Sequence, residues 1–254
     1  MTGDETTMND SAIVTGGGSG IGQAVARRLA EAGHGVVLFG RRRAALEETA
    51  ASIQGDCAIV PGDVRSPADL QAAVAAADRM GGATLLINNA GIMPIAPMAE
   101  GAGDDWRDTI EVNVLGALHA IEAVLPGMRA RERGHIVNIS SVAGRHVFPG
   151  AAVYSASKSA LDAISEGLRA ELAADMKRGG PPIRVTSIAP GAVATDLTGS
   201  IRHAATREGT EAYYRSMMHV LTPDDVADAV CFAVEAPPHV CISEIVIRPT
   251  EMVR

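Results

Sequence analysis

The chain has 254 residues, of which 47% are apolar and 20% are charged. This length suits one large domain or two small ones, and the composition excludes a disordered chain. The net charge of −8 excludes a nucleic-acid-binding protein that relies on a broad basic surface. We therefore expect a cytoplasmic protein that acts on a small molecule and binds neither nucleic acid nor membrane.

Targeting and metal-binding signals are weak. Residues 1–10 carry acids and no lysine or arginine, so they predict a loose polar lead-in and no secretory signal. No run of about 18 uninterrupted apolar residues occurs, which argues against a membrane-spanning helix. The three cysteines, Cys57, Cys231 and Cys241, have no CxxC spacing and predict free thiols. No HExxH-like spacing indicates a metal site.

Seven short, β-branched segments predict strands. Most are apolar along their whole length, which is typical of parallel strands covered on both faces. The predicted strands are Ser11–Thr15, Gly35–Gly40, Cys57–Gly62, Thr84–Asn88, His135–Ser140, Ile183–Ala189 and Glu244–Arg248.

Amphipathic, Ala-rich segments between these strands predict helices. Ser66-Pro67 and Thr222-Pro223 are helix-start signals. The predicted helices are Gly22–Glu31, Arg42–Ile53, Pro67–Arg79, Asp104–Arg131, Ala152–Met176 and Pro223–Ala236. Strands that alternate with helices predict one α/β domain over 11–254, with a doubly wound, Rossmann-like parallel sheet. The irregular segment 191–221 is interpreted as a substrate lid.

The first strand leads directly into the glycine-rich turn 15–22, TGGGSGIG, and a helix follows. Glycines there allow a tight turn and let backbone N–H groups approach a pyrophosphate at the helix N-terminus. A flexible loop is the alternative, but the strand before and the helix after favour nucleotide binding. The candidate cofactor-binding residues of the turn are Gly16, Gly18, Ser19, Gly20, Ile21 and Gly22.

Arginines follow the second strand, where NAD-binding proteins usually place an acid for the ribose 2′-hydroxyl. Here Gly40 precedes Arg41, Arg42 and Arg43. Guanidinium groups suit a 2′-phosphate, so Arg41 and Arg42 favour NADP(H) over NAD(H). Compositional bias is the alternative, because only two of the 22 basic residues are lysines. Asp63 and Val64, after the third strand, are expected beside the adenine.

Tyr154 and Lys158 are four residues apart on a predicted helix, so both side chains can point into one pocket. Ser141 ends a predicted strand thirteen residues upstream and is expected at the same edge of the sheet as the glycine turn. A lysine that lies along an amphipathic helix is the alternative for the pair alone.

With these features the chain resembles the short-chain dehydrogenase/reductase family, in its compact single-domain form, over about residues 11–250. The motifs that carry the resemblance are TGGGSGIG (15–22), Asp63-Val64, Asn88-Asn89-Ala90-Gly91, Asn113, Ser141, Tyr154-x-x-x-Lys158 and Pro190-Gly191-x-Val193-x-Thr195. The resemblance implies an oxidoreductase that interconverts a carbonyl and an alcohol, with a nicotinamide cofactor.

The resemblance also implies roles for single residues. The catalytic set would be Ser141, Tyr154, Lys158 and Asn113, with Asn113 holding a water chain to Lys158 through a local helix irregularity. A buried amide bonded to backbone is the alternative for Asn113. Tyr154 would transfer the proton, with its phenolate favoured by Lys158 and oxidised nicotinamide. Further cofactor contacts would come from Asn89, Ala90, Gly91, Tyr154, Lys158, Pro190, Gly191, Val193 and Thr195.

The substrate is less well indicated. The segments Ile201–Arg207, Leu221–Ala227 and Glu244–Thr250 resemble NADP-dependent serine/3-hydroxy acid dehydrogenases and clavulanate-type aldehyde reductases, which implies a small polar carbonyl or 3-hydroxy acid. Candidate carboxylate anchors are Arg145, His146, Arg202 and Arg207, or these are ordinary surface residues. Candidate apolar pocket residues, or ordinary core, are Met93, Ile95, Met98, Val147 and Phe148.

Other functions remain open. A catalytically silent NADP(H) sensor, a 3-ketoacyl reductase acting on acyl-carrier-type substrates, and an extended epimerase or dehydratase are the alternatives. The last needs a larger C-terminal substrate domain than the roughly 60 residues that follow Gly191. The resemblance further implies a homotetramer or dimer, paired through the helices at about 104–131 and 152–176.

Overall fold

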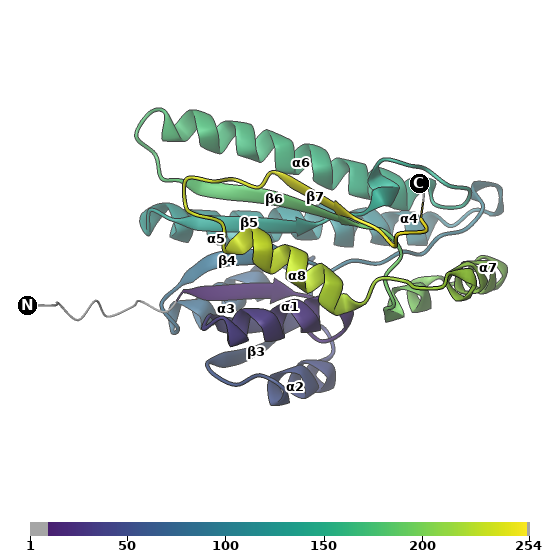
Figure 1. Ribbon diagram of the computed structural model, residues 1–254, viewed down its shortest axis with the longest axis horizontal. Helices are drawn as coiled ribbons and strands as arrows, with labels where there is room; N and C mark the ends of the chain where they lie inside the picture. The colour runs from purple at the N-terminus through teal and green to yellow at the C-terminus, as the bar shows by residue number, and fades with distance from the viewer. Residues whose placement is uncertain (1–9, 253–254) are drawn as a thin grey trace, which may run out of the picture.

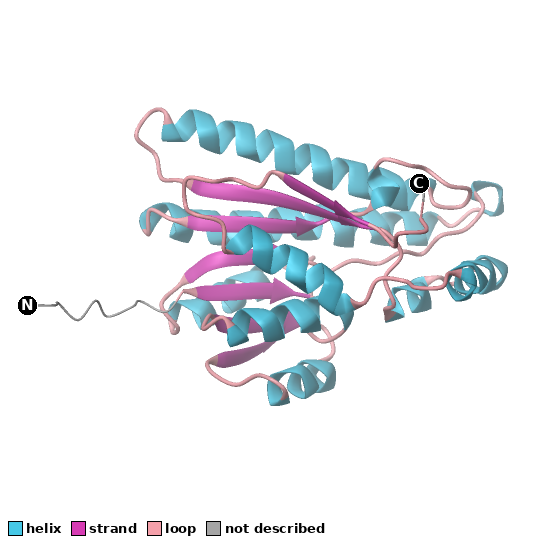
Figure 2. Cartoon of the chain, in the orientation of Figure 1, coloured by secondary structure: helices cyan, strands magenta, loops and turns pink. Residues whose placement is uncertain are grey.

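Seven parallel strands form one sheet at the centre of the computed structural model, which describes residues 10–252 (Figures 1 and 2). The strand order is β3-β2-β1-β4-β5-β6-β7. Each strand ends within one residue of its predicted bounds, and the predicted lead-in lies, apart from Asp10, outside the described residues. The strands are β1 (Ser11–Thr15), β2 (Gly35–Gly40), β3 (Cys57–Pro61), β4 (Ala83–Asn88), β5 (Gly134–Ile139), β6 (Ile183–Pro190) and β7 (Glu244–Ile247).

Helices cover both faces of the sheet, which confirms the doubly wound α/β fold. Buried side chains of α1, α2 and α8 pack on one face, and those of α3, α5 and α6 pack on the other. The α-helices are α1 (Gly20–Glu31), α2 (Arg43–Ala51), α3 (Pro67–Asp78), α4 (Gly103–Ile110), α5 (Gly116–Ala130), α6 (Ala152–Met176), α7 (Ala204–Ser216) and α8 (Pro223–Val234). The short 3₁₀ turns are η1 (Met98–Glu100), η3 (Val142–Gly144) and η4 (Asp196–Ser200).

Two helix starts form as the sequence predicts. The Ser66 hydroxyl accepts a hydrogen bond from the Asp69 backbone N–H (3.2 Å) at the start of α3. At the start of α8, Thr222 and Asp225 form a reciprocal capping box. Such a cap is worth about 1 kcal/mol and sets the helix register.

Two helical predictions need correction. The expected single helix Asp104–Arg131 is interrupted by the π-helical turn η2 (Glu111–Leu115), which separates α4 from α5. The segment 191–221 contains the unexpected helix α7. None of its residues is buried, and alanine is the only aliphatic residue in its sequence, so it lacks the larger aliphatic side chains that help to indicate a helix packed on a core.

The segment Gly103–Ala130 is long and apolar enough to cross a membrane by length and composition. The absence of a long uninterrupted apolar run had argued against a helix of this kind. Buried residues of α5, including Ala120, Ile121 and Val124, pack in the core on one face of the sheet. A core helix of this kind passes the same length and composition test.

The described cysteines Cys57, Cys231 and Cys241 are free thiols. Burial raises the pKa of the Cys231 thiol to about 11 and also raises that of Cys57. Neither thiol is therefore ionised at neutral pH, and both act as small apolar groups beside the core.

His135 on β5 is a buried titratable group with one specific partner. The Thr186 hydroxyl donates to the Ile242 carbonyl (2.7 Å), so it accepts from His135 Nε2–H (2.8 Å). His135 Nδ1 is buried without a partner, as suits the neutral ring. Burial and, secondarily, nearby Arg184 lower the His135 pKa from 6.5 to about 3.

The unfolded chain binds a proton at this ring between about pH 6.5 and pH 3, whereas the folded protein does not. Stability is therefore present above the unfolded pKa and is lost as pH falls through this window, by about 1.4 kcal/mol per unit of pKa shift. We predict that His135→Gln flattens the loss of unfolding free energy between pH 7 and pH 5 in urea titrations. Exposed His239→Gln is the control, and an unchanged acid dependence in the His135 variant would contradict the assignment.

Candidate active site

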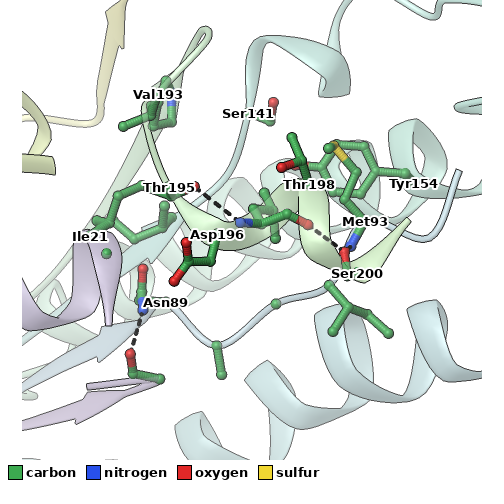
Figure 3. Close-up of a pocket in the computed structure, with 18 of the residues that line it drawn as sticks. Ile21, Asn89, Met93, Ser141, Tyr154, Val193, Thr195, Asp196, Thr198 and Ser200 are labelled. Carbon is green, nitrogen blue, oxygen red and sulfur yellow. Dashed lines mark hydrogen bonds between the residues drawn. The ribbon is translucent and has the colours of Figure 1, made fainter. Parts of the chain in front are cut away.

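A cleft of about 1240 Å³ lies at the carboxyl edge of the sheet, lined by residues from the ends of β1, β2, β4, β5 and β6 and from α6 and α7. In Figure 3, Ile21 and Asn89 lie at one side of the view and Tyr154 and Met93 at the other. Open parallel sheets bind their ligands at this edge. Drug-sized ligands occupy pockets of roughly 300–1,000 Å³, so this cleft has room for a dinucleotide together with a substrate.

The glycine turn after β1 forms a close-packed cradle at the start of α1. Gly16 has φ +68°, a left-handed conformation that side chains rarely adopt. A Cβ atom on Gly22 would lie 2.3 Å from the Gly16 carbonyl oxygen. The Asn89 side-chain amide donates to the Thr15 carbonyl (2.9 Å), and the Thr15 hydroxyl accepts from the Asn89 N–H (3.0 Å). These bonds join the ends of β1 and β4 and hold the turn open for a backbone-bound ligand.

Five residues of the turn line the cleft, namely Gly16, Gly18, Ser19, Gly20 and Ile21, as do Ala90 and Gly91. Gly22, also predicted to contact the cofactor, does not line it and supports the turn from behind. Asn88 is buried and acts within the core instead. Its amide donates to Asn138 Oδ1 (2.9 Å), and the Asn138 amide donates to the Ser165 hydroxyl (2.8 Å). This chain of bonds ties β4 and β5 to α6 below the cleft.

The three arginines after β2 differ in their contacts. The Arg42 guanidinium donates to the Ser19 hydroxyl (2.9 Å), which brings it to the glycine turn. Arg41 also lines the cleft. Arg43 does not line it, and its guanidinium lies 3.8 Å from the Glu47 carboxylate on α2. Two of the three cations therefore face the ligand region.

Asp63 and Val64 line the cleft after β3, as expected. The Asp63 carboxylate accepts two hydrogen bonds from the Arg65 guanidinium, at 2.7 and 3.1 Å, and these bonds lower its pKa. Asp63 therefore stays ionised, and Arg65 occupies much of its hydrogen-bonding capacity.

Tyr154 and Lys158 lie on successive turns of α6 and are 6% exposed each. The Lys158 ammonium is 5.9 Å from the centre of the Tyr154 ring and donates to the Ile139 carbonyl (2.8 Å) at the end of β5. Burial lowers the pKa of Lys158 to about 8, against the opposing effect of Asp162. The ammonium therefore remains mostly charged at neutral pH.

Burial raises the pKa of Tyr154 to about 12, with Ser141 lowering it and Tyr214 raising it further. Desolvation disfavours the phenolate in the protein alone, and the expected stabilisation of the phenolate by Lys158 together with oxidised nicotinamide stays a prediction. With this raised pKa, the Tyr154 side chain is a neutral phenol, which can donate a proton.

Ser141 begins the turn η3, and its hydroxyl oxygen accepts from the Ala143 N–H (3.1 Å). That bond leaves the hydroxyl proton available to a ligand. Both Ser141 and Tyr154 line the cleft, so the structure brings together the two hydroxyls and the ammonium that the sequence predicts.

Comparison with known proteins agrees with this geometry. The short chain dehydrogenase family profile matches residues 10–206. The chain belongs to the short-chain dehydrogenase/reductase family. It is therefore an oxidoreductase of that family, and its members bind a nicotinamide cofactor.

Three relatives show the range of this similarity. An uncharacterized oxidoreductase of Staphylococcus saprophyticus is 39% identical over 240 residues, which cover 94% of this chain and 95% of that protein. The closed form of a serine dehydrogenase complexed with NADP+ has a TM-score of 0.86 at 32% identity, with 96% of each chain covered. A short-chain dehydrogenase/reductase of Burkholderia phymatum in complex with NAD has a TM-score of 0.83 at 28% identity, with 94% of this chain and 88% of that one covered.

In this short-chain dehydrogenase/reductase, Asn113 lies in the π-helical turn, which confirms the expected irregularity. Its amide donates to the Ile92 carbonyl (2.9 Å) and to the Ser157 hydroxyl (3.1 Å), while its Oδ1 accepts from the Ile92 N–H (2.9 Å). This agrees with the alternative of a buried amide bonded to backbone. The π turn thus places Asn113 against the loop that follows β4, beside the cleft.

The loop after β6 contributes the last predicted cofactor residues. Pro190, Gly191, Val193 and Thr195 all line the cleft. A bridge between Val193 and Leu221 joins the two ends of segment 191–221, and the Ala194 N–H donates to the Leu221 carbonyl (2.8 Å). The segment therefore starts and ends at one point beside the cleft.

The structure favours the alternative of ordinary surface residues for two of the four candidate carboxylate anchors. Arg202 and Arg207 do not line the cleft, and Arg202 pairs with Asp105 and Asp108 of α4. Arg145 lines the cleft, but its guanidinium is bound to Glu244. Only His146 remains an exposed cleft-lining candidate among the four. The ion-pair partners are distant in sequence and could not be inferred from local patterns.

The predicted apolar residues divide into two groups. Met93 and Ile95 are buried beside Tyr154 and line the cleft. Val147 and Phe148 line its outer part and are 70% and 43% exposed. Met98 does not line it.

The sequence analysis missed several lining residues, namely Asp196, Thr198, Ser200, Thr206, Thr210, Tyr213, Tyr214 and Met252. A signal existed for two of them. The chain has only three tyrosines, and two of these are adjacent within the lid segment.

Gly22→Ala tests the cradle. The added methyl group would meet the Gly16 carbonyl at 2.3 Å, so the turn must shift, and we expect NADPH binding to weaken at least about tenfold. Gly103→Ala is the control, because a Cβ atom there meets nothing within 4 Å. Fluorescence titration with NADPH measures both variants, and normal binding by the Gly22 variant would contradict the cradle.

Proposed function

We propose that the protein is an NADP(H)-dependent oxidoreductase that interconverts a carbonyl and an alcohol, with Tyr154 as proton donor and acceptor. The observation that carries the proposal is that Tyr154, Lys158 and Ser141 line the same cleft as the glycine turn. The glycine cradle supports a dinucleotide, because its backbone is free of side chains where a pyrophosphate would lie.

In the proposed reaction, the cofactor would transfer the hydride and residues of this chain would transfer the proton. When bound, a nicotinamide accepts or supplies the hydride. In reduction, the neutral Tyr154 phenol donates its proton to the carbonyl oxygen, and the Ser141 hydroxyl donates a hydrogen bond to the same oxygen as negative charge develops. In oxidation, Tyr154 takes the proton from the alcohol.

Lys158 supports that step by charge and position. Its ammonium is fixed by the Ile139 carbonyl and lies beside the Tyr154 ring, so it stabilises the phenolate that forms when the proton leaves. The bond to Ile139 uses one of the three ammonium protons, and the other two can serve a cofactor hydroxyl.

A preference for NADP(H) is supported by Arg41 and Arg42 at the cleft and by the absence of an acid at Gly40. The comparison with the NADP+ complex points the same way, whereas the similar NAD complex does not. A 2′-phosphate beside Arg42 and Ser19 would receive charge-assisted hydrogen bonds.

For the substrate we propose a small polar carbonyl or a 3-hydroxy acid, with residues 191–221 as the lid. Similarity to a serine dehydrogenase supports a polar substrate. The cytoplasmic location and the dimer or tetramer also stay predictions. The predicted pairing helix at about 104–131 carries three apolar side chains that are 38–42% exposed, those of Ile110, Leu115 and Leu118. They would suit an interface, and light scattering of the purified chain would test for one.

Tyr154→Phe tests the proton transfer. The ring is retained, so NADPH binding should stay within about twofold of the wild type, whereas turnover should fall at least about a hundredfold. Carbonyl-dependent loss of NADPH absorbance over a substrate panel measures turnover, and fluorescence titration measures binding. Undiminished turnover would remove Tyr154 from the mechanism, and a wild type that binds NADPH but turns over no carbonyl would favour the silent sensor.

Arg42→Ala and Arg41→Ala test cofactor choice. We expect KM for NADPH to rise about tenfold, as for loss of a charge-assisted hydrogen bond, while KM for NADH stays unchanged. Arg43→Ala is the matched control, because Arg43 is equally exposed but pairs with Glu47 away from the cleft. Equal effects of all three variants, or none, would contradict a 2′-phosphate site at Arg41 and Arg42.

A further inference from the structure

One face of α7 covers the cleft with hydroxyl groups. Its lining residues follow the i, i+3, i+4, i+7, i+8 pattern of a single helix face and are Thr206, Gly209, Thr210, Tyr213 and Tyr214. No residue of α7 is buried in the core, so tertiary packing alone does not explain this face. Four of its five members carry a hydroxyl and none is aliphatic, which suits contact with a polar ligand.

The two threonine hydroxyls of this face are already bonded within the helix. The Thr206 hydroxyl lies 2.7 Å from His203 Nδ1, and the Thr210 hydroxyl donates to the Thr206 carbonyl (2.8 Å). Within residues 10–252, the hydroxyls of Tyr213 and Tyr214 form no hydrogen bond with another protein group. Tyr213 is 51% exposed, whereas Tyr214 is only partly exposed. Of these two unengaged donors, Tyr214 is therefore the less exposed.

Tyr214 and Tyr154 line the same cleft. A negative charge on the Tyr214 phenol also opposes ionisation of Tyr154. Gly209, on the same face of α7, leaves open space, since a Cβ atom built there meets nothing within 4 Å.

The charged alternatives nearby are engaged. The Arg145 guanidinium is bound to Glu244, and Arg202 is bound to two carboxylates of α4. The donors that segment 191–221 presents to the cleft are thus neutral hydroxyls, which suit a hydroxyl, amine or amide group better than they suit a carboxylate.

We propose that Tyr214 is a specificity-determining residue, whose hydroxyl forms a hydrogen bond with a neutral polar group next to the substrate carbonyl. The proposal rests on the proposed carbonyl reduction at Tyr154 and assigns the part of the site that selects among carbonyls. A site built to bond a substrate hydroxyl disfavours an analogue that lacks it.

The experiment compares hydroxyacetone with butanone, which have nearly the same size and differ by a hydroxyl in place of a methyl group beside the carbonyl. We expect the wild type to prefer hydroxyacetone in kcat/KM. Tyr214→Phe should raise KM for hydroxyacetone about tenfold. The kcat for hydroxyacetone and the KM for butanone should stay nearly unchanged. Tyr213→Phe is the matched control, because it removes the adjacent, more exposed hydroxyl and should leave the preference intact.

An unchanged preference in Tyr214→Phe, or an equal loss in Tyr213→Phe, would overturn the proposal. If the wild type turns over neither ketone, both are measured as inhibitors of the best carbonyl of the panel, and their inhibition constants are compared in the same three proteins. If the proposed function itself is wrong, none of the carbonyls in the panel will support oxidation of NADPH by the wild type. That result is distinguishable from failure of the Tyr214 proposal. Normal NADPH fluorescence titration of both variants confirms that their folds are intact.

Discussion

All seven strands run in the same direction, so their carboxyl ends meet at one edge of the sheet. This constraint brings together groups that are far apart along the chain. The glycine turn follows β1, Asn89 follows β4, Ser141 follows β5 and the lid segment follows β6. Helices on both faces carry the core. The loops are in turn joined to one another at the cleft by bonds such as those between Thr15 and Asn89 and between Arg42 and Ser19.

Burial decides the protonation states within that cleft. An apolar environment disfavours both a phenolate and an ammonium, so Tyr154 is held neutral and the Lys158 pKa is lowered. Lys158 still stays charged near pH 7, because its shifted pKa of about 8 remains above that value. A neutral donor beside a retained positive charge suits the reduction proposed above. In that proposal, the proton would leave Tyr154 as negative charge develops on the substrate oxygen, and the ammonium would stabilise the phenolate left behind.

Much of the fold was predictable because its signals are local. Continuous apolar runs indicated the strands, and α6 has its predicted bounds. The glycine turn and the pair Tyr154 and Lys158 were predictable because their spacing is short and their conformations are demanding. The helix α7 was not, since alanine is the only aliphatic residue in its sequence and none of its residues is buried. The π turn at Asn113 was expected only from the family resemblance.

Predictions about charged residues failed for a different reason. Whether an arginine is free to bind a carboxylate depends on its ion-pair partners, and those of Arg145 and Arg202 are about a hundred residues away along the chain. The same applies to Tyr154, whose pKa is set mainly by how completely the folded chain excludes water. A motif therefore indicated which groups meet, whereas the three-dimensional packing determines their charge and availability.

Arg202, a candidate anchor that does not line the cleft, has a structural role at the start of α7. Arg202 and His203 immediately precede α7, and they pair with Asp105 of α4 and Glu100 of η1. The helix α4 continues into the π turn, where Asn113 holds the backbone of Ile92 beside the cleft. The start of α7 is thereby fastened to the same support that positions the cleft wall near Lys158. These pairs place α7, and the face that α7 presents to the cleft is neutral.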